Sequence, residues 1–100
     1  MAIVAVSITP IGKEVSVSKY VAAAERVLLD KPGIKRQIGP MFTTLEGELD
    51  EIMQVIREMQ EAVFATGVER LSTSIKIDDR RDKTITMDGK IKAVEEKLQS

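Results

Sequence analysis

The middle of the chain reads Gly39-Pro40-Met41-Phe42-Thr43-Thr44-Leu45-Glu46-Gly47-Glu48, and the other predicted elements are arranged around this segment. Glycine followed by proline marks a turn, because glycine reaches positive φ at little cost while proline fixes φ and lacks an N–H donor. Apolar and polar side chains alternate on both sides of this turn. The pattern therefore predicts a hairpin with strands over residues 34–38 and 41–46.

The second strand of this hairpin carries polar groups on a sheet surface. Successive side chains of a strand point to opposite faces, so Met41, Thr43 and Leu45 share one face. Phe42, Thr44 and Glu46 share the other. Two threonines followed by a carboxyl group on a strand indicate a place for a ligand, although the residues alone do not identify that ligand.

The segments that flank the hairpin predict the remaining elements. The β-rich run over residues 2–9 ends at Pro10, and apolar residues recur at helical spacing over about 19–30 and 52–66. Ser16 and Ser18 are candidate N-caps of the first helix, and Gly67 is the expected stop of the second. Alternation returns over 71–78, a charged run covers 79–83, and a last helix is expected over about 87–99.

The order of these elements is β-α-β-β-α-β with one additional helix, which is the split βαβ, ferredoxin-like arrangement of an α+β protein. Right-handed crossovers place both long helices on one face of a four-stranded antiparallel sheet, with the first and third strands in the centre. The chain is short and has no linker-like segment, so we expect one domain over residues 1–100.

This topology leaves one face of the sheet without a helix. The face is expected to carry Ala5, Ser7, Thr9, Phe42, Thr44, Glu46, Ser72, Ser74 and Lys76. Such a surface is too polar for a dry core and too rich in hydroxyl groups for a simple solvated face. We therefore expect a homo-oligomer that joins sheet faces, or the edges of the second and fourth strands, and that encloses a pocket between subunits.

Composition narrows the classes of function. The 15 basic and 16 acidic residues leave a net charge of -1, so no concentrated basic surface is expected for nucleic acid or for an anionic membrane. The first strand is too short to span a membrane. The chain has no cysteine, which suits the cytoplasm, and no histidine, which removes the commonest general base. Carboxyl groups are plentiful, but none lies in a recognised metal-binding loop, so no metal site is expected.

Four blocks of sequence, taken together and in this order, resemble the small YkoF-like thiamine-binding family. They are Ile8-Thr9-Pro10-Ile11-Gly12, Ser16-Val17-Ser18-Lys19-Tyr20-Val21, Gly39-Pro40 with Thr43-Thr44-Leu45-Glu46-Gly47-Glu48, and Lys76-Ile77-Asp78-Asp79-Arg80-Arg81-Asp82. The resemblance implies a ferredoxin-like subunit of a tetramer, built as a dimer of dimers. It also implies binding of thiamine or its hydroxymethylpyrimidine portion, without catalysis and without a cofactor. The motif positions that it carries onto this chain are Ser18, Tyr20, Thr43, Thr44, Glu46, Asp78 and Arg80.

Each of these positions also has a structural explanation. Ser18 could cap a helix, Tyr20 could pack in the core, and the threonines could simply favour a strand. Glu46 could pair with the N-terminus of the second helix, and Asp78 with Arg80 could form surface ion pairs. Two other functions stay open: an enzyme in which Glu46 or Asp78 is the general base, and a structural or regulatory homo-oligomer that binds no vitamin.

Overall fold

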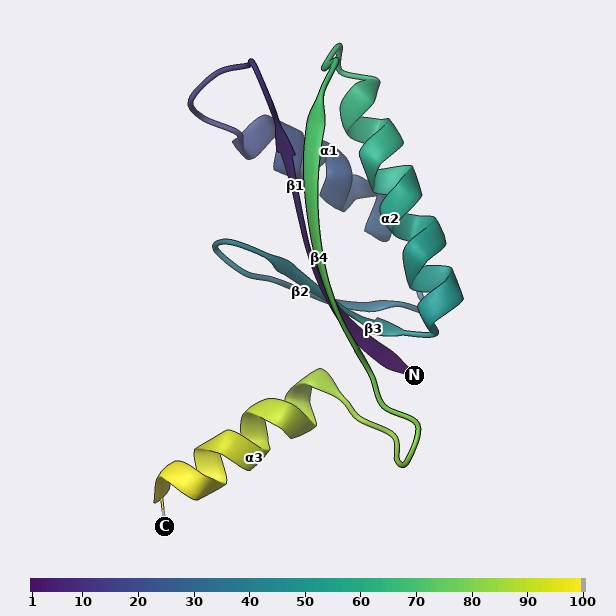
Figure 1. The fold of residues 1–100 in the computed structure, drawn as a ribbon, viewed down its shortest axis with the longest axis vertical. Helices are drawn as coiled ribbons and strands as arrows, with labels where there is room; N and C mark the ends of the chain where they lie inside the picture. Colours follow the sequence, from purple (N-terminus) through teal and green to yellow (C-terminus); the bar gives the residue numbers. More distant parts are fainter. Residues whose placement is uncertain (100) are drawn as a thin grey trace.

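The computed structural model describes residues 1–99, which form a four-stranded antiparallel sheet and three helices (Figure 1). Ser100, the last residue of the predicted domain, lies outside the described residues. The elements are β1 (Ala2–Pro10), α1 (Ser18–Leu28), β2 (Lys35–Ile38), β3 (Thr43–Gly47), α2 (Leu49–Phe64), β4 (Leu71–Asp79) and α3 (Met87–Gln99). Their order confirms the predicted α+β, ferredoxin-like fold.

The strands lie in the order β2-β3-β1-β4, so the first and third strands are central, as predicted. The two partners of β1 differ in how far they follow it. β3 pairs with β1 from Ala2 to Val6, whereas β4 continues along β1 to Pro10. Beyond Val6, β1 is therefore paired on one side only, and this difference shapes the cavity described below.

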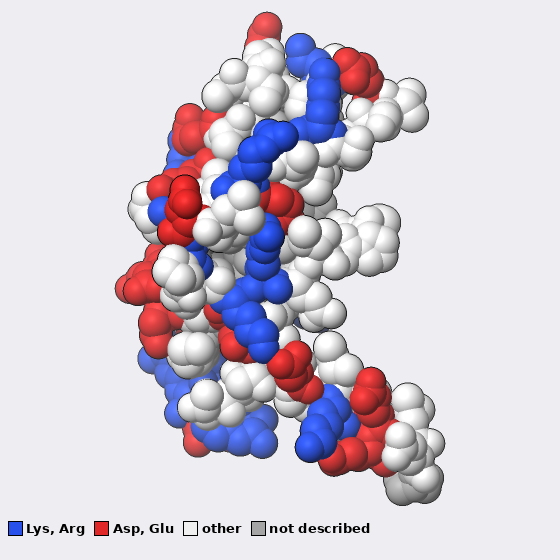
Figure 2. All heavy atoms as spheres, turned by 180° about the vertical axis from the view of Figure 1, so that it is seen from behind, with Lys and Arg blue, Asp and Glu red and all other residues white. Residues whose placement is uncertain are grey.

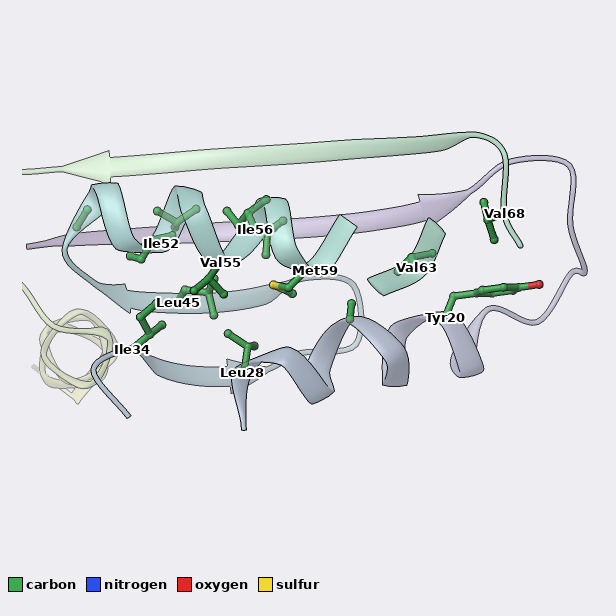
Figure 3. Close-up of a cluster of buried hydrophobic side chains, with 14 residues drawn as sticks. Tyr20, Leu28, Ile34, Leu45, Ile52, Val55, Ile56, Met59, Val63 and Val68 are labelled. Atoms are coloured by element: carbon green, nitrogen blue, oxygen red, sulfur yellow. The ribbon is translucent and has the colours of Figure 1, made fainter. Parts of the chain in front are cut away.

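The helices α1 and α2 cover one face of the sheet and form the main core with it (Figure 3). Leu45 of β3 and Ile52 and Val63 of α2 are fully buried. The alternate residues Ala2, Val4 and Val6 of β1 point into the same core, which follows from the two-residue period of a strand. Burying each large side chain contributes roughly 1.5–3 kcal/mol, so this layer accounts for much of the stability of the fold.

The other face carries the polar side chains that alternation predicts, including Ser7, Thr44 and Lys76. Phe42 is an exception, because β3 begins at Thr43 and not at Met41. The backbone N–H of Gly39 donates to the carbonyl of Phe42 at 2.9 Å and closes a turn over residues 39–42. A Cβ atom at Gly39 would lie 2.7 Å from that carbonyl oxygen, so only glycine fits the turn as built.

The ends of the two long helices test the predicted capping residues. The N-cap of α1 is Val17, and no side chain makes a capping hydrogen bond there, so the expectation that Ser16 or Ser18 caps this helix is wrong. Ser18 is instead the first helical residue. Gly67 follows α2 with φ of 101°, the left-handed conformation expected at a helix stop.

The helix α3 begins against the polar face of the sheet, so the expectation that this face carries no helix is wrong at that place. Beyond its first turns α3 projects away from the rest of the molecule (Figure 1). Thr86 precedes it, and the Thr86 Oγ1 accepts a hydrogen bond from the backbone N–H of Gly89 at 2.9 Å, as an N-cap does. Ile91, Val94 and Leu98 remain exposed along its length. Among the described residues, none of the helices has both the length and the apolar character needed to cross a membrane.

Candidate functional site

The structure separates the predicted site residues instead of gathering them. Thr44, Glu46 and Asp78 lie on the polar face of the sheet. Thr43 points the opposite way, into the helix-covered side, where it is buried. The remaining three lie elsewhere: Ser18 and Tyr20 in the first turn of α1, and Arg80 just beyond β4.

Glu46 and Asp78 hold the start of α3 against the sheet. The Glu46 Oε1 accepts a hydrogen bond from the backbone N–H of Met87 at 2.7 Å, and the Lys90 ammonium donates to Asp78. The ammonium of Lys35 donates to the Asp88 carboxyl at 2.7 Å, and this hydrogen bond raises the pKa of Lys35. Glu46 is thus an N-terminal partner of a helix, but of the third helix and not of the second.

Thr44 lines a hollow of about 270 Å³ beside α3. Its walls mix apolar and charged groups: Ile3, Ala5, Gln37, Thr44, Lys76, Asp78, Met87, Lys90 and Ile91. The carboxyl of Asp78 is already paired with Lys90 in this hollow. The hollow therefore offers a threonine hydroxyl and an amide, but its acid is engaged in holding the helix.

Arg80 forms a surface ion pair. Its Nε lies 2.5 Å from one carboxyl oxygen of Asp82 and its Nη2 lies 2.8 Å from the other. This hydrogen bonding raises the pKa of Arg80 and lowers the pKa of Asp82. Both side chains are largely exposed, so the pair contributes little to stability.

Tyr20 packs in the core with Val63 and Val68 around it, and only 4% of its surface is exposed (Figure 3). The ammonium of Lys19 lies 5.0 Å from the centre of its ring. The burial of Tyr20 matches core packing, which is the structural explanation offered for this residue from the sequence. Neither Tyr20 nor Ser18 lines the cavities that involve the other predicted residues.

Thr43 lines a second cavity, of about 240 Å³, which lies between β1, the hairpin turn and α1. The cavity occupies the position where β3 would lie if it followed β1 beyond Val6. Its walls are mainly apolar: Val6, Ser7, Ile8, Thr9, Val17, Val21, Ala24, Glu25, Gly39, Pro40, Met41, Phe42, Thr43 and Met59. Small-molecule pockets begin at roughly 300 Å³, so this space suits a fragment about the size of one ring.

One acid, Glu25, lies in this apolar cavity with only 8% of its surface exposed. The hydroxyl of Thr43 donates a hydrogen bond to the Glu25 Oε1. The Arg36 Nη1 donates to the backbone carbonyl of Glu25 at 3.2 Å and lies 3.5 Å from the Glu25 Oε2. Burial of a carboxyl group is costly unless it is paired, and these two partners provide the pairing.

Glu25 was not among the residues selected from the sequence, although the sequence carried a signal for it. It follows Val21 by four positions and precedes Leu28 by three, which places it within the apolar stripe of α1. An acid at such a position is buried if the helix packs on a sheet, and so needs a partner. That signal was available without the structure, but the identity of the partners was not.

The fold and the cavity define a small ferredoxin-like α+β protein with a ring-sized apolar cavity around one buried acid. The family model for thiamine-binding proteins matches residues 4–95. The chain therefore belongs to the thiamine-binding protein family, and the resemblance seen in its sequence blocks is confirmed.

Individual relatives agree with this assignment. The UPF0045 protein YqgV of Bacillus subtilis is 47% identical over 103 residues, which covers 99% of both chains. The crystal structure of protein MJ1052 from Methanocaldococcus jannaschii superposes with a TM-score of 0.86 at 42% identity and covers 95% of this chain and 96% of that one. Protein TM0486 of Thermotoga maritima, a candidate thiamine biosynthesis or salvage protein, gives a TM-score of 0.76 at 24% identity and covers 93% and 97%. At that identity the last similarity concerns the fold alone.

Proposed function

We propose that this protein binds thiamine, or its hydroxymethylpyrimidine portion, without converting it chemically. We place the ligand in the cavity around Glu25, so that Thr43 is the one residue of the predicted set that lines the site. Membership of the thiamine-binding family supports the class of ligand. The observation that carries the location is the buried, cavity-lining carboxyl group of Glu25, held by Thr43 and Arg36.

The chemistry of the cavity suits such a ligand. The pyrimidine ring of thiamine is flat and apolar on its faces and presents nitrogen donors and acceptors at its edge. Apolar walls from Val21 and Met59 can contact the faces, while the Glu25 carboxyl group and the Thr43 hydroxyl can reach the edge. Phe42, which is 40% exposed, can stack on the cationic thiazolium ring, a contact worth roughly 0.5–2 kcal/mol.

The proposal includes a homo-oligomer, with a tetramer built as a dimer of dimers. Ser7 and Thr9 belong to the polar face of the sheet and also line the cavity. A neighbouring subunit that covers this face would therefore close the cavity as well. The chain has no cysteine, which suits a reducing compartment, and we place the protein in the cytoplasm on this basis.

The structure gives less support to the enzyme hypothesis than to a structural or regulatory homo-oligomer. The enzyme hypothesis relies on Glu46 or Asp78 as a general base, but both carboxyl groups are engaged in holding α3. The structural or regulatory oligomer is favoured by one observation, the exposed apolar stripe of α3. We keep this second function as the alternative to ligand binding.

Titration calorimetry with thiamine and with hydroxymethylpyrimidine tests the proposal, in parallel with native mass spectrometry of protein purified from its own cells. We expect saturable heat with unchanged ligand recovered afterwards, and a tetramer that retains a small molecule. Recovery of a chemically altered ligand would favour the enzyme. The absence of heat with both compounds, for a protein that still assembles, would favour the structural oligomer.

A further inference from the structure

Glu25 keeps acceptor capacity that its partners do not use. A carboxyl group offers about four acceptor positions when ionised. Thr43 occupies one position on Oε1, and Arg36 lies beside Oε2 at the long distance of 3.5 Å. Arg36 does not line the cavity, whereas Glu25 does. The acid therefore presents an acceptor, backed by a cation, to whatever occupies the cavity.

The backbone of β1 supplies a second set of polar groups to the same space. Within the described residues, β3 pairs with β1 only up to Val6, and residues 7–9 pair with β4 alone. In an antiparallel strand, alternate residues direct both their N–H and their C=O to the same side. At least one residue among 7–9 therefore directs a donor and an acceptor toward the cavity, which all three residues line.

We infer that Glu25 and this unpaired edge of β1 select a heteroaromatic ring with an exocyclic amine next to a ring nitrogen. The amine N–H donates to the Glu25 carboxyl group, and the ring nitrogen pairs with the backbone of residues 7–9. Glu25 is thus a specificity-determining residue, and this role depends on the proposed function. The same ring with a carbonyl oxygen in place of the amine would set two acceptors against each other.

The free-energy cost of placing a carbonyl oxygen against the Glu25 carboxyl group predicts how much more weakly the carbonyl analogue binds than the amine. A buried acceptor without its donor weakens binding roughly tenfold to 100-fold. The substitution Glu25→Gln supplies an amide that can donate to a carbonyl oxygen, so it should reduce or reverse the preference. The matched control is Glu61→Gln on α2, because Glu61 pairs with Arg57 on an exposed surface and does not line the cavity.

The experiment compares thiamine with oxythiamine, the analogue that carries a carbonyl oxygen in place of the ring amine. Calorimetry on the full chain should show oxythiamine binding at least tenfold more weakly to the unmodified protein and to Glu61→Gln, with the ratio lost in Glu25→Gln. In NMR spectra, thiamine should shift at least one backbone amide among residues 7–9.

The outcomes separate the two proposals. Equal affinity of the unmodified protein for both compounds overturns the inference and leaves thiamine binding intact. Binding of neither compound overturns the proposed function and the inference with it. The comparison of the two ligands on the unmodified protein does not depend on a variant, so it tests the preference for the amine even if Glu25→Gln does not fold. A preference of at least tenfold that persists in folded Glu25→Gln overturns the role of Glu25. Thiamine binding that leaves the amides of residues 7–9 unshifted overturns the role of the β1 edge.

Discussion

Thr43 and Thr44 show how much the face of a strand decides at the scale of one residue. The two are identical and adjacent, but Thr43 is buried on the helix side and donates to Glu25, while Thr44 lies on the polar face beside Ala5. The difference follows from the two-residue period of a strand. Only Thr43 satisfies a buried acid, so the two hydroxyl groups should differ in their contribution to stability.

Replacing each threonine by valine tests this difference, because valine keeps the shape and removes the hydroxyl group. Thr43→Val leaves the Glu25 carboxyl without its closest donor and should lower the free energy of unfolding by about 1–3 kcal/mol. Thr44→Val should change it by less than about 0.5 kcal/mol. Urea unfolding of both variants measures the effect. Equal losses would show that the Thr43–Glu25 hydrogen bond contributes no more stability than the hydroxyl group of Thr44 does.

At the scale of the elements, the turn over residues 39–42 and the start of α3 are held by specific contacts. The turn provides one wall of the cavity, and its shape depends on the close approach of Gly39 to the Phe42 carbonyl. The helix α3 depends on Glu46, which reaches it from β3 across 41 positions of sequence. A substitution at Gly39 should therefore disturb the turn alone, and a substitution at Glu46 should disturb the start of α3 alone.

Gly39→Ala should disturb the turn, because the added Cβ would lie 2.7 Å from a backbone oxygen. We expect a loss of stability of about 1–3 kcal/mol and weaker thiamine binding. Gly33→Ala is the control, since a Cβ there would meet only the end of the Glu51 side chain at 3.6 Å. Thermal unfolding and calorimetry give the two readouts. Similar behaviour of the two variants would contradict the role of the turn.

Glu46→Ala should release the first turn of α3 while the main core stays intact. The variant removes the acceptor of the Met87 N–H, so the amide hydrogen of Met87 should exchange faster. Amides of α2 should keep their protection. Glu48→Ala is the matched control, because the Glu48 side chain is largely exposed, makes no capping hydrogen bond to α2 and forms a long ion pair of 3.9 Å with the N-terminal ammonium. Unchanged exchange at Met87 would show that Glu46 does not anchor the helix.

At the scale of the whole molecule, α3 gives the chain an elongated shape. The radius of gyration is 14.9 Å, compared with about 13 Å for a compact domain of 100 residues. Charges of both signs are intermingled over the face shown in Figure 2, and uncharged residues make up most of the margin from which the hairpin projects, while the projecting α3 shows both charged and uncharged side chains. An exposed apolar stripe on a projecting helix favours contact with a second copy of the chain.

The double substitution Val94→Glu with Leu98→Glu tests this contact. Both side chains are more than half exposed, so the subunit should fold normally, but sedimentation should show a smaller assembly than for the unmodified protein. Glu95→Gln, elsewhere on the same helix, should leave the assembly unchanged. An unaltered assembly in the double variant would exclude α3 from the subunit interface and favour the sheet face or the edges of β2 and β4.

Taken alone, the sequence was sufficient for the order of the elements, the strand order and the two faces of the sheet. These follow from local periodicity and from handedness rules, as Leu45 inside and Thr44 outside illustrate. Local patterns were less reliable at the ends of elements, where Val17 and not a serine lies at the N-cap of α1 and Phe42 falls in a turn.

The partners of the acidic side chains follow from the packing of the whole chain. Glu25 meets Thr43 across 18 positions and Arg36 across 11, and Glu46 meets the start of a helix 41 positions away. Such contacts depend on where β3 ends along β1 and on how α3 leaves the sheet. No local pattern encodes those distances, because packing of the whole chain sets them.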